Sequence, residues 1–136
     1  MNELLKLAEP NERTHLRDQA VACMAEIRRF YKLAESQNGW LEDDDLEAFR
    51  LLALSIEYRS TEWNCDMYGL EPNEARVILC HGGPHVEVLY QISGYSTPDD
   101  CALVGYWWGD RFDLELSAEQ TEALEWAFDM WGVYTY

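Results

Sequence analysis

Beyond its first 36 positions, the sequence has few basic residues. Over 136 residues, 26 acidic side chains stand against 10 basic ones, which gives a formal net charge of -16. Residues 37–136 contain four arginines and twenty acids, so the whole net charge lies there, whereas residues 1–36 are neutral. Such a charge is repelled by nucleic-acid phosphates and by anionic membranes, so direct binding to either is not expected. A basic protein partner remains compatible with the composition.

The sequence also lacks a long apolar run and paired cysteines. No stretch of 18 apolar residues occurs, and the first residues lack the basic-then-apolar layout of a secretory signal, so a cytoplasmic location in a bacterial host cell is expected. Cys23, Cys65, Cys80 and Cys101 are far apart in the sequence and form no CxxC motif. In a reducing compartment they are interpreted as small buried hydrophobic residues rather than as a disulfide framework.

What the sequence does contain is enough apolar material for one folded domain. Hydrophobic residues make up 48% and aromatic residues 13%, which a disordered acidic tail would not have. Apolar residues at steps of three and four predict a helix over residues 12–35, which Gly39 would terminate. A second helix is predicted over residues 42–58, with acids in its first turn. Together, residues 1–58 form the predicted helical part of a single domain.

The following residues predict β-strands. Residues 59–74 are a predicted connection, anchored by Trp63 and Tyr68. Residues 75–80 and 86–92, the second of which alternates apolar with other residues, predict an antiparallel hairpin around the HGGPH turn. A second hairpin is predicted from residues 102–108 and 111–116, with Gly109 and Asp110 in its turn. These segments predict a four-stranded antiparallel sheet.

A third helix is predicted to begin after Ser117. Ser117 suits the N-cap position, Gln120 completes a capping box, and Leu116 can act as the preceding hydrophobic staple. The predicted fold class is therefore α+β, with two N-terminal helices, the four-stranded antiparallel sheet and a C-terminal helix, in one domain over residues 1–136.

Sequence motifs give little support for catalysis. No Walker loop, G-x-G-x-x-G, H-E-x-x-H or G-x-S-x-G motif occurs. The segment with Cys80, His81 and His85 leaves three functional readings open: a zinc site completed by a distant cysteine, an oxyanion-hole loop, or a Cys-His dyad. A structural turn is preferred, because zinc ligands usually come in pairs and adjacent strand residues point to opposite faces. No enzyme activity, metal or cofactor is predicted, although a small enzyme that uses these residues stays open as an alternative.

Two groups of acids are the predicted partner-binding residues. A surface of spaced carboxylates can occupy the basic groove of a nucleic-acid-binding protein, and exposed aromatic side chains would hold such a complex together. The alternative is that the acidity only keeps the protein soluble. The predicted contact residues are Glu42, Asp43, Asp44, Asp45 and Glu47 in the second helix, and Glu119, Glu122, Glu125 and Asp129 in the third.

Residues 75–131 carry a resemblance to a known class of protein. The stretches VILCHGGPHVEVLYQISGY and ALVGYWWGDRFDLELSAEQTEALEWAFDMW resemble the strand, GGP turn, strand module of small acidic phage and plasmid proteins. Proteins of this size and acidity resemble antirestriction proteins and anti-CRISPR inhibitors, several of which imitate nucleic acid. The resemblance implies a non-enzymatic, DNA-mimic-like inhibitor whose partner is a basic bacterial protein or complex: a CRISPR effector, a restriction enzyme or a nuclease. The alternative is an immunity protein or antitoxin that neutralises a basic nuclease toxin. Self-association into a homodimer through the neutral helical part also remains open.

Overall fold

A computed structural model describes residues 2–59, 73–81, 83–92 and 98–133, with side chains from residue 15 onward. The chain is α+β, with N-terminal helices, an antiparallel sheet and a C-terminal helix, as predicted. In the described residues the sheet has five strands, whereas the sequence predicted four. The elements are α1 (Asn2–Ser36), α2 (Asp43–Arg50), β1 (Ser55–Arg59), β2 (Glu74–Cys80), β3 (His85–Gln91), β4 (Asp100–Trp107), β5 (Asp110–Asp113) and α3 (Ala118–Met130).

The five strands form an antiparallel meander in the order β1-β2-β3-β4-β5. Both predicted hairpins are confirmed, with Val77 opposite Val88 in the first and Tyr106 opposite Arg111 in the second. The turn between β4 and β5 consists of Trp108 and Gly109, one residue earlier than expected, and both have positive φ angles of 53° and 83°. Two such residues make the mirror-image turn that matches strand twist in tight hairpins.

The second predicted helix is the main error in the fold prediction. The structure ends α2 at Arg50 and places residues 55–59 in β1, which pairs with β2 from Ser55 opposite Ile78 to Arg59 opposite Glu74. Ile56 satisfies a helical repeat and also a strand alternation, so the local pattern allowed both. The segment around Ile56 forms a strand because its backbone pairs with β2. The predicted connection that follows, with Trp63, Tyr68 and Cys65, lies mostly outside the described residues.

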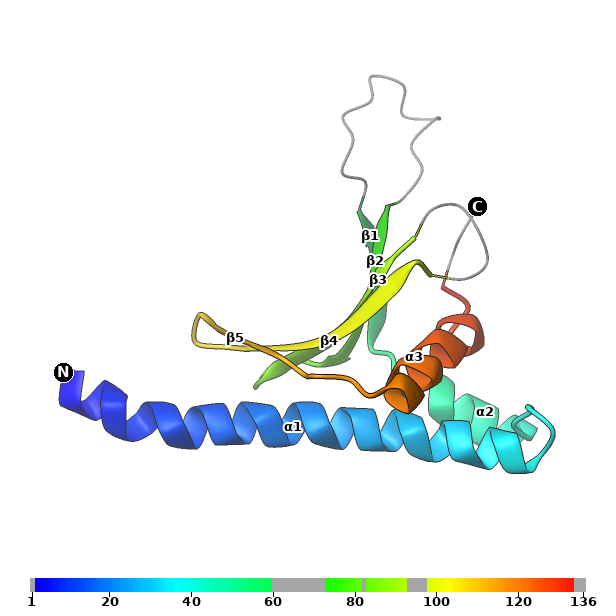
Figure 1. Cartoon of the computed structure of the whole chain (residues 1–136), viewed down its shortest axis with the longest axis horizontal. Coiled ribbons are helices and arrows are strands. Elements are labelled where there is room, and N and C mark those ends of the chain that lie inside the picture. The colour runs from blue at the N-terminus through cyan, green and yellow to red at the C-terminus, as the bar shows by residue number, and fades with distance from the viewer. Residues whose placement is uncertain (1, 60–72, 82, 93–97, 134–136) are drawn as a thin grey trace, which may run out of the picture.

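Both long helices pack on the same side of the curved sheet (Figure 1). α1 lies along β4 and contacts α3, and the opposite, concave face of the sheet carries no described helix. Gly105 of β4 permits the close approach, because a Cβ atom there would lie 2.7 Å from Cδ1 of Leu16 in α1. The predicted helix over residues 12–35 is thus confirmed, although α1 begins earlier, at Asn2.

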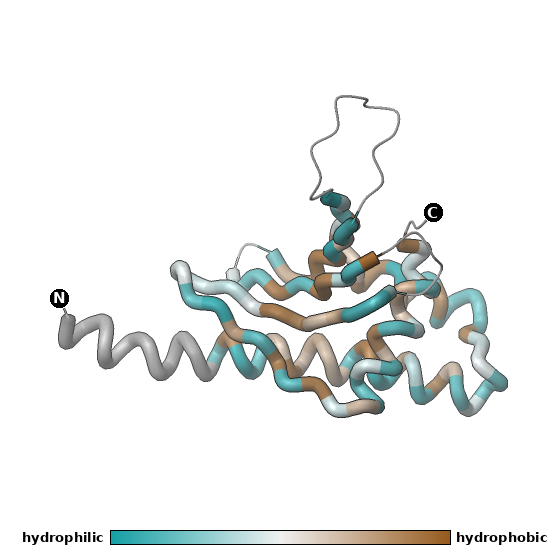
Figure 2. The backbone as a smooth tube through the Cα atoms, turned by 45° about the horizontal axis from the view of Figure 1, so that its top comes forward, coloured by the Kyte–Doolittle hydropathy of each residue, from teal (hydrophilic) through white to brown (hydrophobic). Residues whose placement is uncertain are grey.

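The hydrophobic core lies between the sheet and the helices. Figure 2 shows hydrophobic stretches in the strands, and in β3 every second residue, Val86, Val88 and Tyr90, is fully buried, so one face of the sheet packs on the helices. Tyr90 is fully buried, donates a hydrogen bond to the Leu124 carbonyl at 2.6 Å and contacts the Phe128 ring edge-on. The core residues of α1 are Leu16, Ala20, Met24, Ile27, Phe30 and Ala34.

The predicted start of α3 is confirmed in detail. Ser117 Oγ accepts a hydrogen bond from the Gln120 backbone N–H at 3.1 Å, and the Ser117 N–H donates to Gln120 Oε1 at 2.9 Å. This reciprocal capping box satisfies two donors that an uncapped helix would leave open. It also fixes the orientation in which the acids of α3 are presented.

Candidate functional site

The acids predicted on the second helix lie at one end of the molecule. Asp45 is half-buried and close enough to α1 for its charge to act on Arg29 of that helix. The hydrogen bond of Arg29 to Glu26 is the main cause that raises the pKa of Arg29, and the charge of Asp45 adds to it. The other acids of this group project into solvent, at the start of α2 and along its outer face. These exposed acids are Glu42, Asp43, Asp44 and Glu47.

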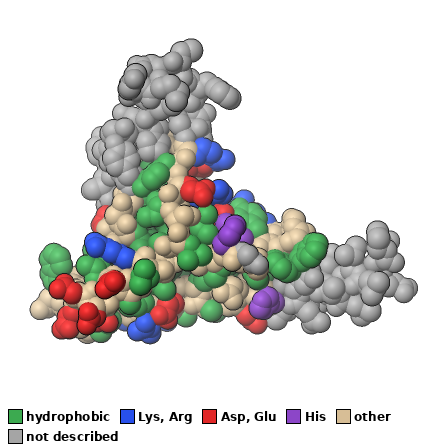
Figure 3. Space-filling model, turned by 180° about the vertical axis from the view of Figure 1, so that it is seen from behind, with side chains coloured by type: hydrophobic (Ala, Val, Ile, Leu, Met, Phe, Trp, Pro, Cys, Tyr) green, Lys and Arg blue, Asp and Glu red, His purple; other side chains and the backbone are tan. Residues whose placement is uncertain are grey.

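Exposed apolar side chains border these acids at both ends of α2. Trp40 is 72% exposed just before the helix, Leu51 is 71% exposed at its C-cap, and Leu54 is 59% exposed just before β1. A helix of eight residues is only about 12 Å long, so anchors and acids share one small surface. Figure 3 shows acidic and hydrophobic side chains side by side at this end, which is called the α2 end. The α2 end comprises residues 40–54.

The acids predicted on the third helix are in a different situation, because α1 supplies cations to them. Glu119 Oε1 lies 2.9 Å from Arg28 Nε and 2.9 Å from Lys32 Nζ. Hydrogen bonds from Arg28 and then Lys32 hold the pKa of Glu119 below its usual range. Tyr31 donates to Glu122 Oε2 at 3.5 Å. Glu119 and Glu122 are therefore engaged by side chains of α1, which makes them less available to a partner.

The remaining two acids of α3, Glu125 and Asp129, are both exposed, and their charges act on Tyr90 of the sheet. Partial burial raises the pKa of Asp129. Glu125 is exposed, and its charge is one of the influences, after burial, that raise the pKa of Cys101 to about 11. Of the two predicted acidic groups, the one on α2 thus combines exposure with neighbouring apolar anchors, and the one on α3 does not.

The Cys80–His85 segment is a hairpin turn in which these residues separate. Cys80 faces α1, where its Sγ lies 3.6 Å from Cys23 Sγ, whereas His85 lies on the concave face. His81 is exposed, and its ring lies 5.8 Å from that of His85. Cys80 thus faces α1 while the two histidines lie close to each other, so a dyad of Cys80 with His81 or with His85 has no geometric support. Among the described residues, no group of three or more His, Cys, Asp or Glu side chains could hold a metal ion.

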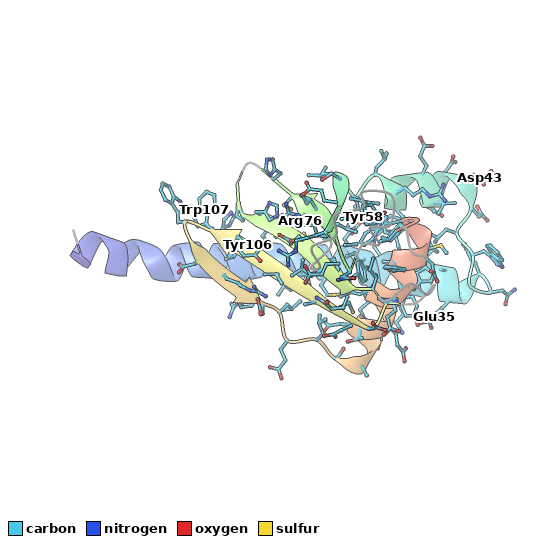
Figure 4. All side chains as sticks on the ribbon, turned by 90° about the horizontal axis from the view of Figure 1, so that it is seen from above. Glu35, Asp43, Tyr58, Arg76, Tyr106 and Trp107 are labelled. Atoms are coloured by element: carbon cyan, nitrogen blue, oxygen red, sulfur yellow. The ribbon has the colours of Figure 1, made fainter. Side chains whose placement is uncertain are left out.

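The concave face of the sheet holds a groove that the sequence analysis missed. Its volume is about 840 Å³, and all five strands line it. In Figure 4, Arg76 and Tyr106 lie over the sheet, far from Asp43 at the α2 end. The available signal was the alternation of charged residues with buried ones along the strands, which marks a polar face. The polar side chains in the groove are Glu57, Arg59, Glu74, Arg76, His85, Glu87, Gln91, Tyr106 and Arg111.

Glu87 lies at the centre of this face and is only 2% exposed. Its Oε1 atom is 3.0 Å from His85 Nε2 and 3.7 Å from Arg76 Nη1. A buried carboxylate is costly unless it is paired, and these two groups supply the pairing. The ring of Tyr106 lies 5.8 Å from that of His85, and the Arg111 guanidinium lies 5.8 Å from the Tyr106 ring.

The outer rims of the groove fix the orientation of its arginines. Arg76 donates from Nε (2.9 Å) and Nη2 (2.5 Å) to Glu57 Oε1. Arg111 donates from Nε (2.7 Å) and Nη2 (3.3 Å) to Asp113. The hydrogen bond to Glu57 raises the pKa of Arg76, and Glu87 and Tyr106 add to it. A continuous series of polar contacts therefore crosses the sheet from β1 to β5.

Comparison of the chain with protein-family models, with curated proteins and with solved structures found no match. None of the described helices is long and apolar enough to cross a membrane.

Proposed function

We propose that this protein is a non-enzymatic inhibitor that binds the basic nucleic-acid-binding surface of a bacterial defence complex through its α2 end. The observation that carries the proposal is the exposure of Trp40 and Leu51 beside Asp43, Asp44 and Glu47. Anti-CRISPR and antirestriction inhibitors are the classes that this proposal names, and a CRISPR effector, a restriction enzyme or a nuclease is the partner.

The acids and the apolar side chains would contribute to binding in different ways. Spaced carboxylates steer a basic partner toward the surface and form charge-assisted hydrogen bonds with its arginines and lysines. A desolvated tryptophan at the centre of an interface typically supplies a large share of the affinity. Such a patch suits protein binding better than solubility alone, because solubility needs no exposed Trp40 or Leu51.

An immunity protein that caps a basic nuclease toxin would use the same surface. The two readings differ in the partner and not in the chemistry, so identification of the partner separates them. A partner that is a toxin encoded beside this protein would favour immunity. A CRISPR or restriction component would favour defence inhibition.

The test is a competition experiment with a purified partner. Tagged protein retains binding proteins from a bacterial lysate at low and at high salt, mass spectrometry identifies them, and a labelled DNA duplex then competes for the purified partner. We expect a basic nucleic-acid-binding protein whose retention falls as salt rises, and loss of its DNA binding when the inhibitor is added. DNA binding that persists in the complex would contradict the proposal.

Two sets of charge reversals identify the contact surface. Asp43→Lys, Asp44→Lys and Glu47→Lys together should abolish competition. The matched control reverses three exposed acids of α3, Glu122→Lys, Glu125→Lys and Asp129→Lys, and should retain competition. Trp40→Ala should weaken binding roughly thirtyfold, which corresponds to the loss of about 2 kcal/mol typical of an interface hot spot. Circular dichroism confirms folding of each variant. Equal losses from both charge sets would place the contact elsewhere.

A further inference from the structure

The concave groove gathers most of the positive charge of the acidic part of the chain. Residues 37–136 contain four arginines, and three of them, Arg59, Arg76 and Arg111, line this groove. Three glutamates, Glu57, Glu74 and Glu87, line it as well, so the charges are balanced here although the protein carries -16. The groove is thus electrostatically distinct from the α2 end, and it calls for a separate explanation.

The hydrogen-bonding groups of the groove are held in place before any ligand arrives. Arg76 and Arg111 each use Nε and Nη2 on a carboxylate at the rim, which orients each guanidinium group. Arg59 is paired with Glu74, which also accepts from Gln91 at 2.8 Å. Fixed donors and acceptors lose little conformational entropy on binding, which favours recognition.

The balance of charge selects the kind of ligand. An anion would have to displace the carboxylates that already hold the arginines, and the field of the whole protein would repel it. A cation would be repelled by the three guanidinium groups that line the groove. An uncharged ligand with several hydroxyl groups avoids both costs, because each hydroxyl can accept from an arginine and donate to a carboxylate.

Tyr106 adds an aromatic surface in the middle of these groups. Tyr106 is half-buried. The centroid of its ring lies 5.8 Å from the centroid of the His85 ring and 5.8 Å from Cζ of Arg111. An aromatic ring among a few convergent polar groups is the usual composition of a small-ligand site. The volume of about 840 Å³ also lies in the range of about 300–1,000 Å³ that is usual for such sites.

From these observations we infer that the concave groove binds an uncharged, polyhydroxylated ligand of the carbohydrate class, with a sugar ring packed on Tyr106. Arg76 and Arg111 donate to the hydroxyl oxygens, and the exposed carboxylate of Glu57, which orients Arg76, accepts from a hydroxyl group. This site is independent of the α2 end and of the inhibitor function proposed above.

The experiment is a titration of isotope-labelled full-length protein followed by two-dimensional amide NMR. The probes are a panel of neutral mono- to tetrasaccharides, with inorganic phosphate as the anionic probe and spermidine as the cationic probe. We expect saturable shifts of amides in β2 to β5, around Arg76, Glu87 and Tyr106, with at least one saccharide. These shifts should be insensitive to salt, because the ligand is uncharged.

Variants tie the shifts to the groove. Tyr106→Ala and, as a milder second change, Arg111→Gln should each weaken saccharide binding about tenfold, the factor that corresponds to 1.4 kcal/mol. Trp40→Ala at the α2 end should leave it unchanged, while Tyr106→Ala should leave competition with DNA for the protein partner unchanged. Groove shifts caused only by phosphate or only by spermidine, or no groove shifts with any saccharide, would overturn the inference.

Discussion

At the scale of single residues, the fold contains a strained tryptophan and a pair of close thiols. Trp108 has a φ of 53° at the β4–β5 turn, in a region that bulky side chains rarely adopt, and its side chain is 79% exposed. It contacts Trp107 edge-on, with ring centroids 5.9 Å apart. An exposed side chain regains little of such a backbone cost through packing, so the turn conformation is imposed by strand pairing on both sides.

Replacement of Trp108 should therefore stabilise the protein. Asparagine adopts the left-handed region readily and is favoured at this position of a two-residue hairpin. We expect Trp108→Asn to increase the free energy of unfolding by about 1 kcal/mol, the lower end of the cost of such strained residues. Urea unfolding measures the change, with Trp107→Asn, at a position of ordinary backbone, as the matched control. Destabilisation by Trp108→Asn would show that packing of this side chain outweighs the strain.

Cys23 and Cys80 are placed to form a disulfide under oxidation. Their Sγ atoms are 3.6 Å apart, and Gln19 Nε2 lies 3.1 Å from Cys80 Sγ. Burial, and then the neighbouring Cys80, raise the pKa of Cys23 to about 12, so attack should begin from Cys80 on an added small-molecule disulfide. This attack releases one small thiol and leaves a mixed disulfide at Cys80. Cys23 then attacks the mixed disulfide, releases the second small thiol and completes the Cys23–Cys80 bond, so the reagent is reduced to two thiols as the two protein sulfurs are oxidised.

We expect peptide mapping to find the Cys23–Cys80 link after this treatment, together with a higher unfolding temperature, because the crosslink closes a long loop. Cys101→Ser is the matched control and should form the same link. A stable mixed disulfide at Cys80 in place of the link would contradict the expectation.

At the scale of secondary-structure elements, α1 and α3 are joined by one carboxylate with two cations. Glu119 lies in the first turn of α3 and contacts Arg28 and Lys32 on successive turns of α1. Aromatic contacts continue this interface, with Tyr31 and Trp126 rings 5.6 Å apart. Because the side chain of Glu119 is 39% exposed, each of its ion pairs is expected to stabilise the fold only weakly.

Glu119 should make stability fall in acid. Its pKa is lowered in the folded state, first by Arg28, so its contribution is present above the ordinary glutamate pKa of 4.5 and is lost as pH falls through the lower folded value. We expect Glu119→Gln to be less stable than the natural chain at neutral pH and to lose less stability between pH 5 and pH 3, where carboxylates of this kind titrate. Urea midpoints at a series of pH values measure this, with Glu125→Gln as the control. Identical pH profiles for Glu119→Gln and the natural chain would exclude the effect.

At the scale of the whole molecule, positive charge is concentrated in two places. Arg28 and Lys32 of α1 bind Glu119 at the start of α3, and three arginines lie in the concave groove. The α2 end keeps its acids exposed beside apolar anchors. A net charge of -16 also means that the folded chain repels itself.

Salt should therefore stabilise the fold. Screening of the net repulsion should outweigh the loss of the exposed ion pairs, which contribute little. We expect the unfolding temperature to rise by about 3 °C, or about 1 kcal/mol for a chain of this size, between low and physiological ionic strength. The Asp43→Lys, Asp44→Lys and Glu47→Lys variant carries less net charge and should show a smaller rise. A fall in unfolding temperature with salt would mean that the ion pairs dominate.

Local sequence was sufficient for the elements whose signals are local. The capping box at Ser117 and Gln120 and the apolar spacing in α1 depend on neighbours a few residues apart, and both predictions are confirmed. The strand alternation around Val88 predicted the first hairpin, and the turn signal at Gly109 predicted the second. The fold class followed from the order of these elements.

Only the tertiary structure decided the rest, because the deciding contacts join residues far apart in the sequence. β1 exists because Ile56 and its neighbours pair with β2, and Glu119 is neutralised by cations 91 and 87 residues away. The groove has the same origin: five strands bring Glu57, Arg76, Glu87, Tyr106 and Arg111 onto one concave face. The sequence determined how much negative charge the protein carries, and the packing of α1 and of the sheet determined where that charge is left exposed.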